Sequence, residues 1–199
     1  MLEPQQSEVP YLVLGRHAPT VPRSGVTSSE WSLAPGANEL TQALAAALKG
    51  EFPIDLVVTS HEPKAVGTGR TLAAGLGVKA ITGPDLEEHH RQRTALLDEA
   101  AWLRTVRRFF GSPHVLLFGQ ETGAEARSRM QRGLRAAQGA HAGKRLAVVS
   151  HATVITLLLA GPNALAPYDL WRSMRMPEAL VVEPGTLRIL ARVAPQGAG

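Results

Sequence analysis

Three short apolar runs constrain this chain most strongly, because each is typical of a buried strand and each ends in polar residues. The runs cover residues 11–16 (YLVLGR), 54–59 (IDLVVT) and 145–150 (RLAVVS). Segments with helical periodicity lie between them. Strands that alternate with helices favour a mostly parallel sheet whose two faces are covered by helices. We therefore predict an α/β protein built as a three-layer α/β/α sandwich.

Helices are predicted where apolar residues repeat at helical spacing. In segment 38–49, Leu40, Leu44 and Leu48 lie four residues apart, and Gly50 follows the end of the pattern. The other predicted helices are 62–76, 96–110, 122–137, 152–159 and 164–174. A strand is predicted at 78–82, and a closing hairpin of 179–182 and 186–191 turns at Pro184-Gly185. This hairpin gives the sheet an antiparallel edge strand.

The composition indicates one domain that spans residues 1–199, with loose tails at 1–9 and 193–199. Apolar residues make up 44% of the 199 residues, which is enough for a core, and cysteine is absent. No apolar run approaches the ~20 residues that a membrane helix needs. The first residues do not resemble a signal peptide. We expect no membrane partner and, by default, a cytoplasmic location.

The charge pattern favours a small anionic ligand over a nucleic acid. The formal net charge is +4, the basic residues are scattered along the chain, and only 5% of the residues are aromatic. A stacking surface for nucleic acid needs clustered cations and aromatic side chains. We therefore expect no nucleic-acid partner.

Chemically active residues follow the apolar runs. Arg16-His17 ends the first run, Ser60 and His61 follow the second with Lys64 one helical turn later, and His151 follows the third. The carboxyl ends of parallel strands meet at one edge of a sheet, and helix N-termini there favour anions. One histidine could attack phosphorus while the cations and the other histidine neutralise the phosphoryl oxygens.

A leaving alcohol would then need a proton from a nearby carboxyl. The segment 86–93 (LEEHHRQR) supplies two candidates, Glu87 and Glu88. A bound dianion raises the pKa of a neighbouring carboxyl, which would let it act as the acid.

These residues, taken in order, resemble the motifs of the histidine phosphatase superfamily, the phosphoglycerate-mutase-like proteins. Arg16-His17-Ala18 is similar to the RHG signature, and Thr20 matches a threonine common three residues after the histidine. The other matching segments are 31–48 before and in the first helix, 60–68 (SPxxRAxxTA), 86–88 (LxE), Glu121 with Arg129 (GES…R), and 148–151 with the second histidine. The resemblance covers residues 11 to about 160 and implies the phosphoglycerate-mutase-like fold.

The resemblance implies a role for each matching residue. His17 would be the transiently phosphorylated nucleophile, and Arg16, Lys64 and His151 would bind the phosphoryl group. Glu88, selected by the LxE spacing over Glu87, would donate the proton and later activate water. The implied activity is that of a histidine acid-type phosphatase, a phosphoric monoester hydrolase that needs no cofactor and acts on a small phosphorylated metabolite.

Several positions depart from the family pattern. Lys64 replaces the usual arginine, which keeps the charge but loses the bidentate fork. Ala18 replaces the glycine of RHG, and Arg23 stands where asparagine is common, six residues after the catalytic histidine. Thr20, Arg23 and His89 are candidate substrate contacts.

Alternative functions remain open at this point. The same fold could act as a phosphoglycerate-type phosphomutase, although the short segment 83–94 argues against the longer insertion that excludes water from such sites. Lys64 and Ala18 could also mark a catalytically degenerate member that binds a phosphorylated ligand. We predict no metal site, because the adjacent His89 and His90 cannot easily reach one ion. A monomer and a homodimer are both compatible with the sequence.

Overall fold

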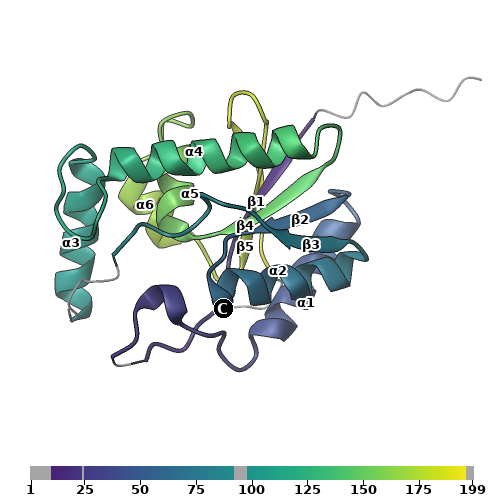
Figure 1. Ribbon diagram of the computed structural model, residues 1–199, viewed down its shortest axis with the longest axis horizontal. Coiled ribbons are helices and arrows are strands. Elements are labelled where there is room, and N and C mark those ends of the chain that lie inside the picture. Colours follow the sequence, from purple (N-terminus) through teal and green to yellow (C-terminus); the bar gives the residue numbers. More distant parts are fainter. Residues whose placement is uncertain (1–9, 24, 92–97, 196–199) are drawn as a thin grey trace, which may run out of the picture.

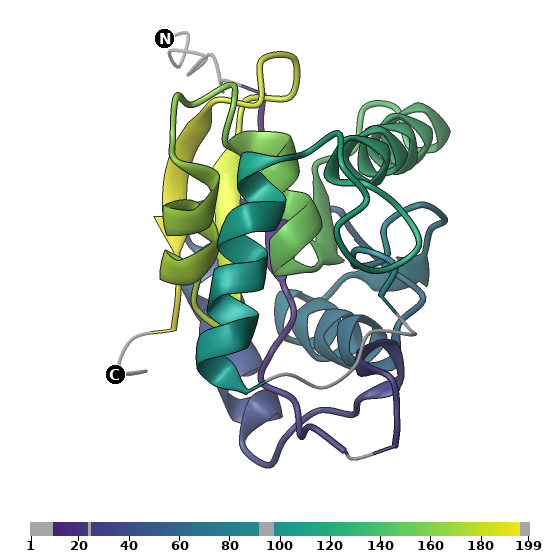
Figure 2. The same cartoon turned by 90° about the vertical axis from the view of Figure 1, so that its left-hand side faces the viewer.

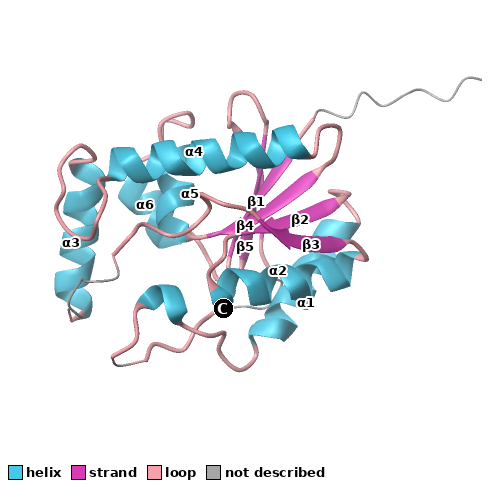
Figure 3. Cartoon of the chain, viewed as in Figure 1, coloured by secondary structure: helices cyan, strands magenta, loops and turns pink. Residues whose placement is uncertain are grey.

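Six strands form one mixed sheet in the computed structural model (Figure 1, Figure 3). The structure describes residues 10–23, 25–91 and 98–195. The strands are β1 (Leu12–Arg16), β2 (Leu56–Thr59), β3 (Lys79–Thr82), β4 (Leu146–Ser150), β5 (Glu178–Val182) and β6 (Ile189–Val193). They lie side by side in the order β3-β2-β4-β1-β5-β6. The first four in this order are parallel, whereas β5 runs antiparallel to β1 and β6, so the predicted antiparallel edge is confirmed.

Helices cover both faces of the sheet, which confirms the predicted three layers (Figure 1, Figure 2). One outer layer contains α1 (Ala37–Lys49) and α2 (Pro63–Leu76), and the other contains α4 (Gly123–Ala140), α5 (Ala152–Leu159) and α6 (Pro167–Ser173). The helix α3 (Glu99–Gly111) packs against α6. A short 3-10 helix, η1 (Ser28–Glu30), interrupts the predicted loop 18–36. Within the described ranges, no helix is long and apolar enough to cross a membrane.

Strand side chains alternate between two hydrophobic cores. In β1, Leu12 and Leu14 join the core beside α4 and α5, whereas Val13 joins the core beside α1 and α2. In β4, Val148 and Val149 alternate in the same way. Because both faces of these central strands are buried, their sequences are continuous apolar runs.

The bounds of the elements differ from the predicted ones by a few residues. The helix at 152–159 agrees with the prediction, whereas the second strand of the hairpin is β6 (Ile189–Val193) rather than 186–191. The connection is wider than a tight turn at Pro184-Gly185, because Leu187 adopts φ 59° and its N–H donates to the carbonyl of Glu183.

The prediction for the carboxyl tail is partly wrong, because Val193 pairs with Ala179 as the last residue of the sheet. The predicted tail residues 1–9 and 196–199 lie outside the described residues. The same holds for residues 96–97 of the predicted helix 96–110. The observed helix α3 begins at Glu99, because the side chain of Asp98 caps it by accepting the N–H of Ala101.

The neighbouring strands β2, β4 and β1 end at the same edge of the sheet. The register of β1 and β4 pairs Arg16 with Ser150. Beyond the strands, the N–H of His17 donates to the carbonyl of Ser150 at 3.1 Å, and the N–H of Ser60 donates to the carbonyl of Val149 at 3.0 Å. The sheet therefore brings together the strand ends on which the sequence-based site was predicted.

Candidate active site

His17 lies directly after β1, and the backbone around it fixes its ring. Its Nδ1–H donates to the carbonyl of Ala18 at 2.7 Å, so a neutral ring keeps its lone pair on Nε2. The N–H of Ala18 donates to Thr68 Oγ1 at 2.9 Å, which ties this turn to α2. Burial lowers the pKa of His17 to about 3, and the charges of Lys64 and Arg16 act in the same direction. His17 is therefore a neutral imidazole near pH 7.

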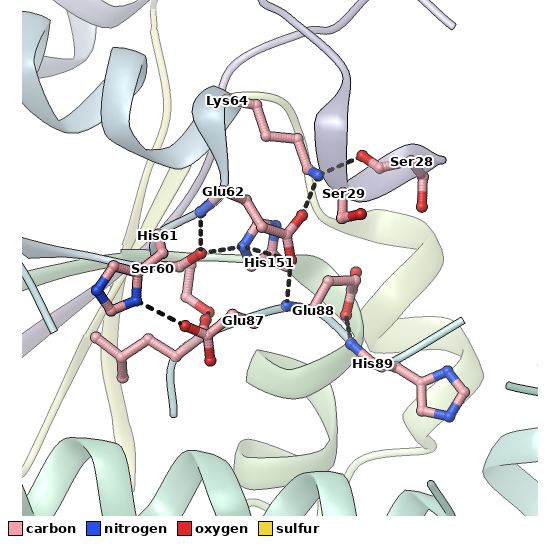
Figure 4. Close-up of polar contacts among 12 residues, drawn as sticks. Ser28, Ser29, Ser60, His61, Glu62, Lys64, Glu87, Glu88, His89 and His151 are labelled. Atoms are coloured by element: carbon pink, nitrogen blue, oxygen red, sulfur yellow. Dashed lines mark hydrogen bonds and ion pairs between the residues drawn. The ribbon is translucent and has the colours of Figure 1, made fainter. Parts of the chain in front are cut away.

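His151 lies between β4 and α5, with its ring beside that of His17. The two ring centroids are 5.2 Å apart. Nε2 of His151 lies 2.8 Å from Ser60 Oγ, and this hydroxyl oxygen also accepts the N–H of Glu62 at 3.1 Å (Figure 4). Burial holds the pKa of His151 well below its ordinary value, and the nearby Lys64 contributes. The two predicted histidines therefore form a buried, neutral pair.

Arg16 brings a cation to the end of β1. Its Nη1 donates to the carbonyl of Met174, whereas its Nε is buried and has no hydrogen-bond partner in the described part of the chain. Burial lowers the pKa of Arg16, and the charges of Glu88 and Glu178 oppose this effect. Arginine remains charged in proteins, so Arg16 offers an unused donor next to His17 in the chain.

Lys64 lies in the first turn of α2, and a carboxylate already partners it. Its Nζ forms an ion pair with Glu62 Oε2 and donates to the carbonyl of Ser28 at 2.6 Å. The side chains of Lys64 and Glu62 are only 5% and 8% exposed. The charge of Lys64 also lowers the pKa values of His17 and His151. Lys64 therefore belongs to the same site as the histidines.

Glu87 and Glu88 are adjacent in the sequence, but their side chains have different partners. Glu88 is buried, with Oε1 accepting the N–H of His89 at 2.8 Å and Oε2 accepting the hydroxyl of Thr153 at 3.1 Å. Glu87 is more exposed and pairs with His61 at 2.9 Å. Of the two, Glu88 is the carboxyl that lines the pocket, and its role as the proton donor remains a prediction.

The pKa of Glu88 departs from the raised value expected beside a dianion. Burial by itself would raise this pKa, but the charge of Arg91 and the N–H of His89 outweigh burial and hold it below the ordinary value. The protein's own groups therefore favour the carboxylate. Glu88 could hold a proton only if a phosphoryl group brings additional negative charge close to it.

A small pocket opens beside these groups. Its cavity volume is only about 10 Å³, so it is a shallow recess. Its lining residues are Ser28, Ser29, Glu62, Glu88, His89 and Arg91. The guanidinium of Arg91 lies over the ring of Trp102, with 4.9 Å between its Cζ and the ring centroid. Two hydroxyl groups, two carboxyls and one cation make the lining of this pocket polar.

The ring of His89 packs among aromatic side chains. Its centroid lies 4.6 Å from that of Phe109 and 4.9 Å from that of Phe118. Its Nε2–H donates to the carbonyl of Glu121 at 2.7 Å. These contacts hold the ring in the aromatic cluster of α3, so a contact of His89 with substrate remains a prediction.

The two other candidate substrate contacts lie in the loop after β1. Thr20 pairs with Leu33 in an isolated β-bridge. Arg23 is exposed, and its carbonyl accepts the N–H of Val26 at 3.3 Å. Their contacts with substrate also remain predictions.

Arg129 of α4 holds the segment that carries Glu88. Its Nη2 donates to the carbonyl of Glu88 at 3.0 Å, and its Nη1 donates to the carbonyl of Glu87 at 2.9 Å. The same guanidinium binds both carboxylate oxygens of Glu121, with Nη2 to Oε1 at 2.6 Å and Nε to Oε2 at 3.1 Å. The Glu121–Arg129 pair therefore positions the backbone of the segment that carries Glu87 and Glu88.

Two charged residues of the pocket, Glu62 and Arg91, were missing from the site predicted from sequence. Glu62 occupies an unspecified position of the 60–68 motif, and Arg91 lies in the predicted polar loop 83–94. A charged residue beside a motif is usually exposed to solvent. Their proximity to Lys64 and Glu88 in the sequence was the only available signal.

The match to a family model agrees with this geometry. The model of the histidine phosphatase superfamily (branch 1) matches residues 12–183. The chain therefore belongs to the histidine phosphatase superfamily. No curated protein is a significant match to it.

Solved structures of the same fold cover most of this chain. YhfR of Bacillus stearothermophilus has a TM-score of 0.70 at 21% identity, covering 91% of this chain and 95% of its own. Mycobacterial glucosyl-3-phosphoglycerate phosphatase in complex with inorganic phosphate has a TM-score of 0.66 at 18% identity, and the match covers 90% of this chain and 94% of that one. A mutant phosphoserine phosphatase of Entamoeba histolytica in complex with phosphoserine has a TM-score of 0.65 at 15% identity, and the match covers 94% of this chain and 98% of that one. At these identities the likeness shows the fold.

We expect the Arg129→Met substitution to lower the free energy of unfolding by about 3 kcal/mol, because Glu121 would remain buried without its partner. Urea denaturation measures this change. Arg132→Met is the matched control on the same helix, since its pair with Asp85 at 3.3 Å is exposed and its loss should cost less than ~1 kcal/mol. Equal losses for the two variants would contradict the role assigned to Arg129.

Proposed function

We propose that this protein hydrolyses phosphomonoesters through a phosphohistidine formed on His17. The observation that carries the proposal is the state of the His17 ring. Its Nδ1–H is bound to the carbonyl of Ala18 and its pKa is lowered to about 3, so the lone pair of Nε2 is free to attack phosphorus. His151 beside it, and the cations of Arg16 and Lys64, support a site for the phosphoryl oxygens.

In the first half of the reaction, His17 would displace the alcohol. A bond forms between Nε2 and phosphorus while the bond from phosphorus to the ester oxygen breaks. Arg16, Lys64 and His151 would stabilise the charge on the other phosphoryl oxygens. Glu88, in its protonated form, would give its proton to the leaving oxygen, so that a neutral alcohol departs.

In the second half, water would replace His17 on phosphorus. The carboxylate of Glu88, left by the first half, accepts a proton from the attacking water. The bond from phosphorus to Nε2 breaks, inorganic phosphate leaves, and His17 returns to its neutral form. Glu88 stays protonated while inorganic phosphate is bound and returns to the carboxylate when phosphate leaves, so the next substrate to bind brings back the proton. Neither half requires a cofactor.

The pocket supports a small phosphorylated metabolite as substrate. Ser28, Ser29 and Arg91 contribute hydroxyl groups and a cation to its lining. These groups would favour a leaving group with hydroxyl or carboxylate oxygens. Two enzymes of the same fold are named for glucosyl-3-phosphoglycerate and phosphoserine, which are substrates of this kind.

One observation favours a second candidate function, a member of the family that binds a phosphorylated ligand without turnover. Lys64, which takes the place of the usual arginine, is already neutralised by Glu62 in a buried ion pair. A phosphoryl group would have less free positive charge to stabilise its transition state.

We expect His17→Ala to reduce the turnover of p-nitrophenyl phosphate by a factor on the order of 10⁴ or more, because the covalent route is lost. The matched control is His61→Ala, since His61 is exposed and pairs with Glu87. Equal turnover by wild type and His17→Ala would contradict the proposal. Phosphate binding by calorimetry, without turnover of a broad phosphoester panel, would select the second candidate.

We expect Glu88→Gln to slow alcohol release in the first turnover by roughly 10²- to 10⁴-fold for alkyl phosphates, because the leaving oxygen lacks its proton donor. The loss should be smaller for p-nitrophenyl phosphate, whose phenolate leaves readily without a proton. Rapid-quench kinetics measures both rates. Glu87→Gln is the matched control, and a larger loss in this variant would assign the acid to Glu87 instead.

A further inference from the structure

Glu62 is a buried carboxyl that the proposed mechanism does not use. It lies among the groups that would bind the phosphoryl group (Figure 4). Its Oε2 pairs with Lys64 Nζ. Its Oε1 accepts the N–H of Glu88 at 2.8 Å and lies 3.5 Å from His151 Nε2. Glu62 therefore contacts Lys64 and His151, two of the three groups proposed to hold the phosphoryl oxygens.

A carboxylate in this place would repel a phosphoryl dianion. Like charges a few ångströms apart in a buried site interact strongly, because little water screens them. The charged and titratable groups that contact Glu62 or share its pocket are Lys64 on α2, Glu88, His89 and Arg91 after β3, and His151 before α5. The 3-10 helix contributes the uncharged carbonyl of Ser28, which accepts a hydrogen bond from Lys64.

We propose that Glu62 takes up one proton from solvent when the phosphoryl group binds, and that the resulting carboxylic acid donates a hydrogen bond to a phosphoryl oxygen. Lys64 is then released from its internal partner and can pair with the dianion. The inference rests on the proposed function, because it needs a phosphoryl group in contact with Lys64 and His151. It adds a second substrate-binding carboxyl to the site.

Among the titratable groups of the pocket, Glu62 is the one that the protein already brings towards protonation. Burial raises the pKa of Glu62, although the ion pair with Lys64 and the N–H of Glu88 oppose the shift. In the free protein, Glu88 is held as a carboxylate by Arg91 and by the N–H of His89. Burial keeps His151 neutral, because it disfavours the imidazolium.

The proposal gives phosphate binding a definite pH dependence. The pKa of Glu62 is lower in the free protein than in the complex, where the dianion raises it further. Between these two pKa values the complex holds one more proton than the free protein. The affinity for phosphate therefore falls about tenfold for each unit of pH increase in that range.

The test measures the dissociation constant of inorganic phosphate by calorimetry from about pH 5.5 to about pH 8.5, for wild type and Glu62→Gln. Glutamine is close in shape to the protonated acid and offers an N–H donor at every pH. The ratio of the two constants cancels the ionisation of phosphate itself. We expect the ratio of wild type to variant to rise by about tenfold or more across this range.

Glu51→Gln, which changes an exposed glutamate, is the matched control and should keep the wild-type profile. A wild-type to Glu62→Gln ratio that stays constant with pH would overturn the inference while leaving the proposed function intact. If neither protein binds phosphate at any pH, the proposed phosphoryl site itself is wrong, and the inference fails with it.

A second measurement uses Glu88→Gln, in case Glu62→Gln does not fold, because this variant removes the proton that Glu88 itself would take up beside a dianion. Calorimetry in buffers with different ionisation enthalpies counts the protons taken up on binding. Sulfate serves as the probe, because it stays a dianion throughout this range. We expect net uptake of up to one proton per sulfate bound near neutral pH, and zero uptake across the range would overturn the inference.

Discussion

The site depends on backbone hydrogen bonds that continue the sheet past its strand ends. The N–H of His17 donates to β4 at Ser150, and the N–H of Ser60 donates to β4 at Val149. These bonds fix the segments that follow β1 and β2 against β4, the strand that ends just before His151. Residues that are far apart in the sequence therefore meet without a flexible loop between them. Rigid elements of this kind hold reacting groups more accurately than loops do.

Burial gives these residues their chemical state. His17 and His151 are both neutral because the interior disfavours a charged imidazole, and neighbouring cations add to the effect. The pKa values of the two buried carboxyls shift in opposite directions in the free protein. Arg91 and the N–H of His89 lower the pKa of Glu88, whereas burial raises the pKa of Glu62. Two carboxyls whose environments push their pKa values apart are suited to different roles.

Much of the fold and the meeting of the two histidines could be predicted from sequence. Buried parallel strands are continuous apolar runs, and their carboxyl ends share one edge, so His17 and His151 were expected to be neighbours. The wide connection before β6 was not predicted, because Leu187 adopts a left-handed conformation that its residue type does not signal. Glu62 was missed because its position depends on Glu88, 26 residues further along, and on the ion pair with Lys64.

The phosphorylated residue is the most direct test of the proposed chemistry. The protein would be mixed with p-nitrophenyl phosphate, quenched within one turnover in alkali, where phosphohistidine survives, and digested for mass spectrometry. We expect one phosphoryl group on the peptide that contains His17, appearing and decaying at rates consistent with turnover. Turnover with the phosphoryl group on His151, or with no phosphorylated peptide at any time, would contradict the assignment of His17 as the nucleophile.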